Sequence, residues 1–173
     1  MAPHEIISKM TPRVASQIFA FLFEKEKPLY KATLETLAKK RNLRPVFVER
    51  KPRDARFAWL KDSLSRPLND GVASHLLQVW LIGTQGPLLC DFLDALGIAH
   101  DENGTVEQLP PAPAKEQLAG AIDTVLSKHD AAVVAVYLHT FQALHEEGGW
   151  STLGELLEAD ARLKLGANAS KSE

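Results

Sequence analysis

The sequence predicts an all-α protein, a single-domain bundle of about seven or eight helices arranged around two central apolar helices. Apolar residues recur at spacings of three and four along most of the chain, which is the helical period. Prolines and capping residues mark several helix starts. With 173 residues, 45% hydrophobic and 24% charged, the chain has the composition of a globular protein that buries its own core.

Three helices are predicted in the N-terminal part. Thr11 is an N-cap before a proline, so the first should cover residues 12–25. A second should begin at Pro28, and a third should follow Pro52. Residues 46–51 lie between prolines and are rich in β-branched side chains, which predicts an extended segment.

The remaining helices include the two apolar ones. Residues 71–82 and 131–144 are apolar on nearly all sides, which is typical of helices at the centre of a bundle. Shorter amphipathic helices are predicted over residues 87–96 and 114–128 and after Ser151. Residues 98–106 contain an Asn-Gly turn signal and could form one small hairpin.

We expect one domain over residues 11–165, with residues 1–10 as an N-terminal extension and residues 166–173 as a disordered tail. The proline-rich connector at residues 109–113 resembles a domain boundary. However, only about 50 ordered residues follow it, which is marginal for an independent core. The second apolar helix also needs the first as a packing partner, which favours one domain.

Several classes of protein are not expected from this sequence. Cys90 is the only cysteine, so no intramolecular disulfide can form, and we expect a packed thiol. No apolar run approaches the ~20 residues of a membrane span, so we expect a cytoplasmic protein without membrane binding. No nucleotide-binding or nucleophile motif occurs, and the six histidines lack metal-ligand spacing. We therefore expect no cofactor and no metal.

Charge is distributed unevenly along the chain. Residues 1–67 contain 15 Lys and Arg against 7 Asp and Glu, whereas residues 68–173 contain 5 against 15. Such asymmetry favours an electrostatic partner, or docking of one half of the chain on the other. The densest basic stretch, residues 39–56, has eight cations against two carboxylates. These eight are the candidate partner-binding residues: Lys39, Lys40, Arg41, Arg44, Arg50, Lys51, Arg53 and Arg56.

Three functions fit these observations. The leading hypothesis is a protein-interaction module whose basic face binds an acidic protein surface or the acidic part of another copy. An alternative is a non-specific nucleic-acid binder that uses the same cations for phosphate contacts. A third is a small helical enzyme with a site between the two apolar helices, around His75 and His139. No nucleophile is placed beside either histidine, so binding is expected rather than catalysis.

Overall fold

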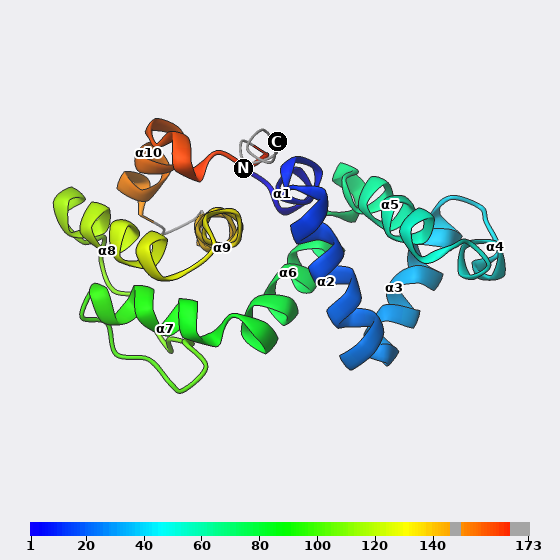
Figure 1. Ribbon diagram of the computed structural model, residues 1–173, viewed down its shortest axis with the longest axis horizontal. Helices are drawn as coiled ribbons and strands as arrows, with labels where there is room; N and C mark the ends of the chain where they lie inside the picture. Colours follow the sequence, from blue (N-terminus) through cyan, green and yellow to red (C-terminus); the bar gives the residue numbers. More distant parts are fainter. Residues whose placement is uncertain (146–149, 167–173) are drawn as a thin grey trace. The chain divides into compact units, whose positions relative to one another are not determined.

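The computed structural model describes residues 1–145 and 150–166, and every regular element in these ranges is helical (Figure 1). The all-helical class is therefore confirmed. The number of helices is higher than predicted, because α1 and α4 were not expected. The helices are α1 (Pro3–Lys9), α2 (Pro12–Lys25), α3 (Lys27–Lys40), α4 (Pro45–Glu49), α5 (Arg53–Leu64), α6 (Asp70–Thr84), α7 (Gly86–Ala95), α8 (Lys115–Lys128), α9 (Ala131–Leu144) and α10 (Ser151–Ala159), with short 3-10 helices η1 (Pro67–Asn69) and η2 (Ala161–Leu163).

The chain divides into two compact units, an N-terminal unit over Ala2–Leu77 and a C-terminal unit that begins at Gln78 and includes Met1. The boundary lies within α6. By sequence, the N-terminal unit carries 15 Lys and Arg against 8 Asp and Glu, a net charge of +7. The C-terminal unit carries 5 against 14, a net charge of −9. The uneven charge of the sequence thus follows the structural division. The predicted single domain over residues 11–165 stays a prediction.

Two parts of the N-terminal unit differ from the sequence prediction. Residues 46–51 were expected to be extended, but Pro45–Glu49 form α4. Pro45 is the first helical residue, where its fixed φ suits the helix, and Val48 is fully buried. Tertiary burial therefore overrides the β propensity of this segment. Residues 1–10 were expected to be an extension, but α1 packs on α5 and buries Ile6 and Ile7.

The two apolar helices differ in burial. In α9, every residue from Ala132 to Phe141 is buried, as expected for a central helix. In α6, by contrast, a buried stripe that includes Leu76 and Trp80 lies opposite exposed residues such as His75. The prediction of two central helices is therefore right for α9 and wrong for α6. Composition alone does not separate these cases, because an exposed apolar side chain is common on folded proteins.

Two helix pairs share the same break. Glu26 alone separates α2 from α3, with φ −119° and ψ 50°. Gln85 alone separates α6 from α7, with φ −115° and ψ 23°. In both pairs, a proline stands in the first turn of the second helix, at Pro28 and Pro87. A proline inside a continuous helix would clash with the carbonyl four residues earlier, so the first helix must end before it.

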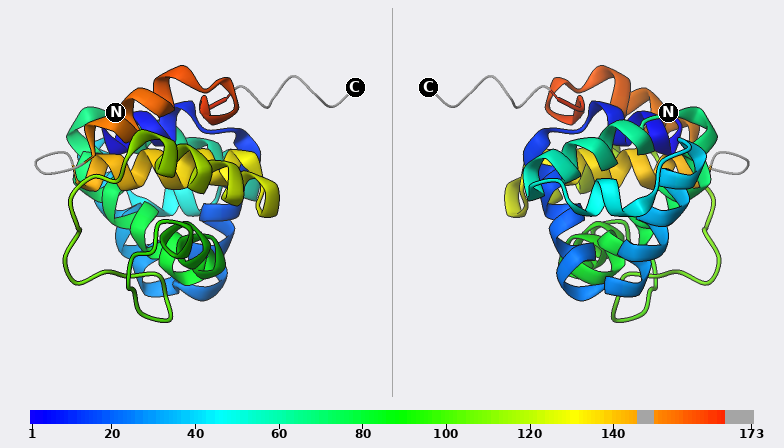
Figure 2. Two further views of the ribbon diagram at one scale, coloured as in Figure 1. Left: turned by 90° about the vertical axis from the view of Figure 1, so that its left-hand side faces the viewer. Right: turned by 90° about the vertical axis from the view of Figure 1, so that its right-hand side faces the viewer.

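The connector between α7 and α8, here residues 96–114, forms no hairpin. The backbone amide of Asp101 donates to the carbonyl of Thr105 at 3.0 Å, and no strand is present in this described segment. The carboxylate of Asp101 instead accepts from the amides of Asn103 and Thr105. Figure 2 shows the connector running as an extended strap before α8. The side chain of Asp101 thus stabilises this turn, and no paired strands are needed to hold it.

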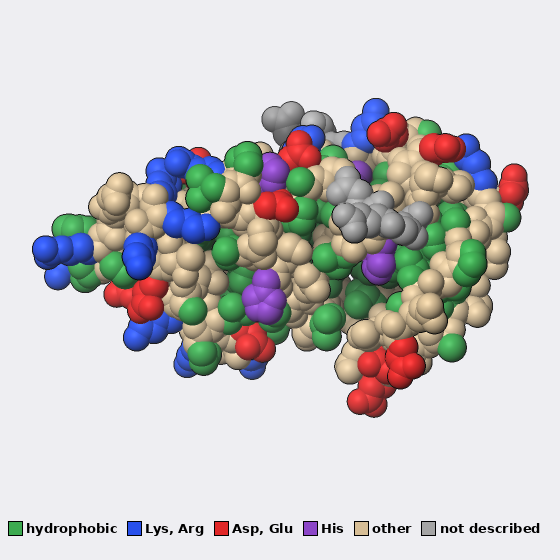
Figure 3. Space-filling model, turned by 180° about the vertical axis from the view of Figure 1, so that it is seen from behind, with side chains coloured by type: hydrophobic (Ala, Val, Ile, Leu, Met, Phe, Trp, Pro, Cys, Tyr) green, Lys and Arg blue, Asp and Glu red, His purple; other side chains and the backbone are tan. Residues whose placement is uncertain are grey.

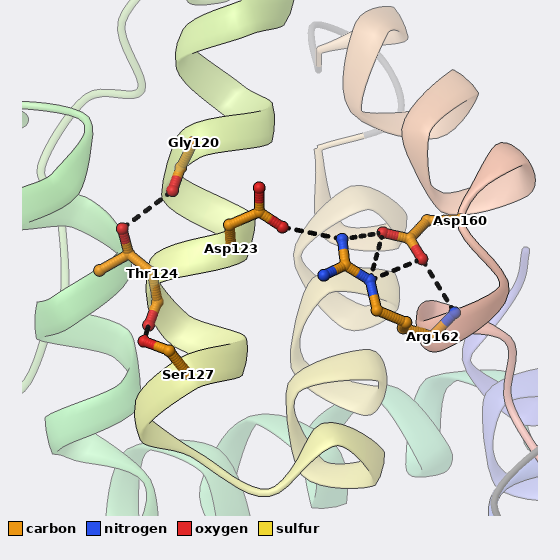
Figure 4. Close-up of polar contacts among 6 residues, drawn as sticks. All are labelled: Gly120, Asp123, Thr124, Ser127, Asp160 and Arg162. Atoms are coloured by element: carbon orange, nitrogen blue, oxygen red, sulfur yellow. Dashed lines mark hydrogen bonds and ion pairs between the residues drawn. The ribbon is translucent and has the colours of Figure 1, made fainter.

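The described end of the chain is held against α8 by Arg162 (Figure 4) and against α9 by Leu163. The guanidinium of Arg162 donates to Asp160 at 2.6 Å and to Asp123 of α8 at 2.8 Å. Leu163 is fully buried, and its carbonyl lies 3.1 Å from Nε2 of His139. Exposed ion pairs contribute little to stability, so burial of Leu163 anchors this segment and Arg162 orients it. The predicted disordered tail falls almost entirely on residues 167–173, outside the described residues.

Candidate functional site

The eight predicted partner-binding cations lie in the N-terminal unit, at the end of α3, around α4 and at the start of α5. Space-filling atoms at the α4 end of this unit show Lys and Arg beside hydrophobic side chains (Figure 3). The fold therefore brings the basic stretch together on one region. It also divides the eight residues into two groups with different surroundings.

The chain reverses direction between α3 and α4 through Asn42. This residue has a φ of 54°, in the left-handed region that asparagine tolerates better than most residues. The amide of Leu43 then donates to the carbonyl of Ala38 at 2.9 Å, which closes the end of α3. Arg44 precedes Pro45, so α4 begins directly after the reversal. This geometry places the residues on both sides of Pro45 at the surface.

Two of the eight cations, Lys40 and Arg41, bind neighbouring parts of the same unit. Lys40 Nζ donates to the carbonyl of Leu68 at 3.0 Å and to Asn69 Oδ1 at 2.8 Å. Arg41 donates to Asp62 at 3.0 Å, and its guanidinium lies 5.4 Å from the centre of the Trp59 ring. These contacts connect the end of α3 to α5 and η1, so we assign Lys40 and Arg41 a structural role.

Arg53 and Arg56 are also engaged, because they stack on aromatic rings. Their guanidinium groups lie 5.7 and 5.2 Å from the centre of the Phe23 ring. Arg53 also pairs with Glu24 at 3.1 Å, and Arg56 donates to the carbonyl of Glu49 at 3.1 Å. Such cation–π contacts keep an arginine in place at the surface. These two residues join α5 to the end of α2.

The other four cations, Lys39, Arg44, Arg50 and Lys51, are exposed, and none has a recorded side-chain hydrogen bond or ion pair within the described ranges. Three apolar side chains on the same segment are exposed as well, with Phe47 57% accessible. Together these residues form what we call the α4 surface: Lys39, Leu43, Arg44, Val46, Phe47, Arg50 and Lys51.

Sequence reasoning located the cations of the α4 surface but not its apolar side chains. The signal was present, because Val46, Phe47 and Val48 form an apolar run between two prolines. A strand would have placed Val46 and Val48 on the same face. In the helix, Val48 is buried whereas Val46 and Phe47 remain exposed. The helical period therefore creates the exposed apolar part of this surface.

His75 and His139, the two histidines of the enzyme hypothesis, differ in burial, and Cys90 was expected to be a packed thiol. His75 is exposed, and His139 is buried with its Nε2 near the carbonyl of Leu163. Cys90 Sγ lies 3.6 Å from the carbonyl of Glu102. Burial, assisted by the carboxylate of Asp94, raises the pKa of this thiol, which keeps it protonated. In the described ranges, no three His, Cys, Asp or Glu side chains gather in a metal-binding arrangement.

The ring of His100 links the connector to α7, and its protonation should change with pH. Its two ring nitrogens lie 2.6 Å from the carbonyl of Asp101 and 2.9 Å from a carboxylate oxygen of Asp94. Only the imidazolium can donate both bonds, and these contacts raise the pKa of His100 above 6.5. Because the pKa of His100 is higher in the folded than in the unfolded protein, the charged ring stabilises the fold. This stabilisation is complete below pH 6.5 and is lost as pH rises through the pKa of the folded state.

We therefore expect His100 to titrate above 6.5 when its ring protons are followed by NMR. Asp94→Asn should shift the pKa of His100 downwards, because the carboxylate that stabilises the imidazolium is lost. A titration curve that is the same in both proteins would show that Asp94 does not stabilise the charged ring.

No single helix in the described part of the chain is long and apolar enough to cross a membrane. The segments 67–84 and 86–95 reach that length and hydropathy together, but they meet at an angle of 86°.

Comparisons with protein-family models, with curated proteins and with solved structures give no match.

Proposed function

We propose that the chain is a protein-interaction module that docks an acidic protein through the α4 surface. The observation that carries the proposal is the combination of four cations, without a recorded partner in the described ranges, and three exposed apolar side chains on residues 39–51. A surface used only for solubility has no need of an exposed Phe47. Apolar side chains supply contact area, while surrounding cations speed the encounter and select for negative charge.

The partner that we would test first is the acidic unit of a second copy. The two units carry net charges of +7 and −9, so each molecule offers both sides of an electrostatic contact. Such a contact joins two different surfaces, which allows rings or open chains of molecules rather than only dimers. The attraction must weaken with salt, because screening acts over about 10 Å at 0.1 M.

Sedimentation velocity of the full chain at about 50 and 200 mM salt tests this assembly. We expect species heavier than 19.0 kDa at low salt and only the monomer at high salt. The triple variant Arg44→Ala, Arg50→Ala and Lys51→Ala should be monomeric in both. The matched control replaces Lys25, Lys27 and Lys31, which are exposed and lie near the other end of α3. If both triple variants weaken assembly equally, net charge drives the assembly and the α4 surface does not.

A nucleic-acid function is the second candidate, because Phe47 stands exposed among cations and could stack on a base. Fluorescence anisotropy can separate the two candidates with three labelled probes: an acidic amphipathic peptide of Glu and Leu, a single-stranded oligonucleotide and a duplex. We expect the peptide to bind and the oligonucleotides to bind more weakly, since the acidic unit repels a long polyanion. Tighter oligonucleotide binding that falls steeply with salt would favour the nucleic-acid function. A monomer that binds none of the probes would contradict both candidates.

A further inference from the structure

The C-terminal unit contains a pocket of about 180 Å³ that is unrelated to the α4 surface. Its walls come from the end of α6, from α7, from the connector and from α9. Most of its lining side chains are aliphatic or aromatic, and two of them, Ile82 and Leu144, are 47% and 42% exposed. Exposed apolar side chains that line a pocket are typical of a ligand site.

One polar group distinguishes this pocket from a packing defect. Tyr137 lines it and is 4% exposed, yet no hydrogen bond from its hydroxyl to a described residue is recorded. Burial raises the pKa of Tyr137 well above its usual range, so the hydroxyl keeps its proton. Thr140, the neighbouring hydroxyl, already donates to the carbonyl of Val136 at 2.7 Å. Tyr137 is thus available as a donor in a mainly apolar pocket, whose other polar lining residues are Gln78, Thr105 and His145.

Size and charge narrow the class of ligand. A cavity of about 150 Å³ lined by apolar side chains holds benzene, so this pocket has room for one ring with a small substituent. No Lys or Arg lines it, and Asp101 and Glu102 stand on the connector beside its wall. An anionic ligand would therefore be repelled. The hydroxyl of Tyr137 needs an acceptor, which a carbonyl oxygen supplies.

We propose that this pocket binds a small neutral carbonyl compound, of one-ring or branched aliphatic shape, with the carbonyl oxygen accepting from Tyr137. The apolar part of the ligand lies among Leu89, Leu93 and Phe141. The connector completes the pocket, because Gly104 brings Thr105 and Val106 against α7. This inference does not rest on the proposed docking function, since none of the residues that line the pocket belongs to the α4 surface.

Ligand-observed NMR titrations of the full chain with acetophenone and cumene test the proposal. The two probes have almost the same shape, and only acetophenone carries a carbonyl. We expect both to bind, with acetophenone binding tighter. Tyr137→Phe should weaken acetophenone binding by about fivefold to tenfold, the effect of one hydrogen bond, and leave cumene within about twofold. Acetophenone binding that is unchanged in Tyr137→Phe would overturn the proposal.

A blocking variant and a contact measurement complete the test. Val106→Phe should fill the pocket and abolish binding of both probes, whereas Val46→Phe, the same change on the α4 surface, should leave binding unchanged. In the unmodified protein, nuclear Overhauser effects should connect the methyl group of acetophenone to the methyl groups of Leu89 and Leu93. If Tyr137→Phe does not fold, these nuclear Overhauser effects test whether acetophenone occupies the pocket. Their absence, or binding to Val106→Phe, would overturn the proposal.

Discussion

Replacing Phe92 with alanine should destabilise the protein by about 3–5 kcal/mol, the largest effect that we predict. Phe92 is fully buried in α7, with its ring centre 5.6 Å from that of Tyr137 and 5.9 Å from that of Phe141. Both contacts are edge-to-face, the favourable arrangement for aromatic rings. Truncation removes these contacts and leaves a cavity between α7 and α9. The loss is a large fraction of the 5–15 kcal/mol that is typical of folded proteins.

Urea unfolding followed by circular dichroism measures this loss. Phe47→Ala provides a matched control, because it is the same substitution at a position that is 57% exposed. We expect the control to change the free energy of unfolding by no more than about 0.5 kcal/mol. Similar losses in the two variants would show that Phe92 is not the centre of a packed core.

Gly104→Ala should be the second most damaging single change, with a cost above the roughly 1–2 kcal/mol of a left-handed backbone. Gly104 has a φ of 75°, which a residue with a Cβ rarely adopts. An added Cβ would also collide with Cβ of Leu89 and lie 3.1 Å from the amide nitrogen of Cys90. The connector must therefore move away from α7, and the pocket beside Tyr137 loses one wall.

Two measurements identify this movement. The thiol of Cys90 should react faster with a disulfide reagent in Gly104→Ala, because its contact with the carbonyl of Glu102 is lost. Gly120→Ala is the control within the same unit, since an added Cβ on α8 meets nothing within 4 Å. Alanine is the better helix former, so this control should stabilise the protein by about 0.5–1 kcal/mol. Equal thiol reactivity in Gly104→Ala and the unmodified protein would contradict the expected movement.

The candidate site could be predicted from the sequence only in part. Charge counts located the basic stretch, because net charge is a property of composition. They could not separate Arg41 and Arg53, which contact Trp59 and Phe23, from Arg44 and Arg50, which have no recorded partner in the described ranges. That separation depends on partners 18 to 30 residues away in the sequence. Local periodicity carries no information about such partners.

The sequence alone determined the helical class and the positions of most helices, because caps, prolines and apolar spacing act within one or two turns. The side chain of Thr11 caps α2, and that of Asp130 caps α9, as their residue types predict. The tertiary structure alone decided that residues 45–49 form a helix, because burial of Val48 among Leu34 and Ala38 outweighs its β preference. It also decided that residues 78–145 enclose a pocket. Contacts between distant residues carry more free energy than local propensity, and only the folded chain brings them together.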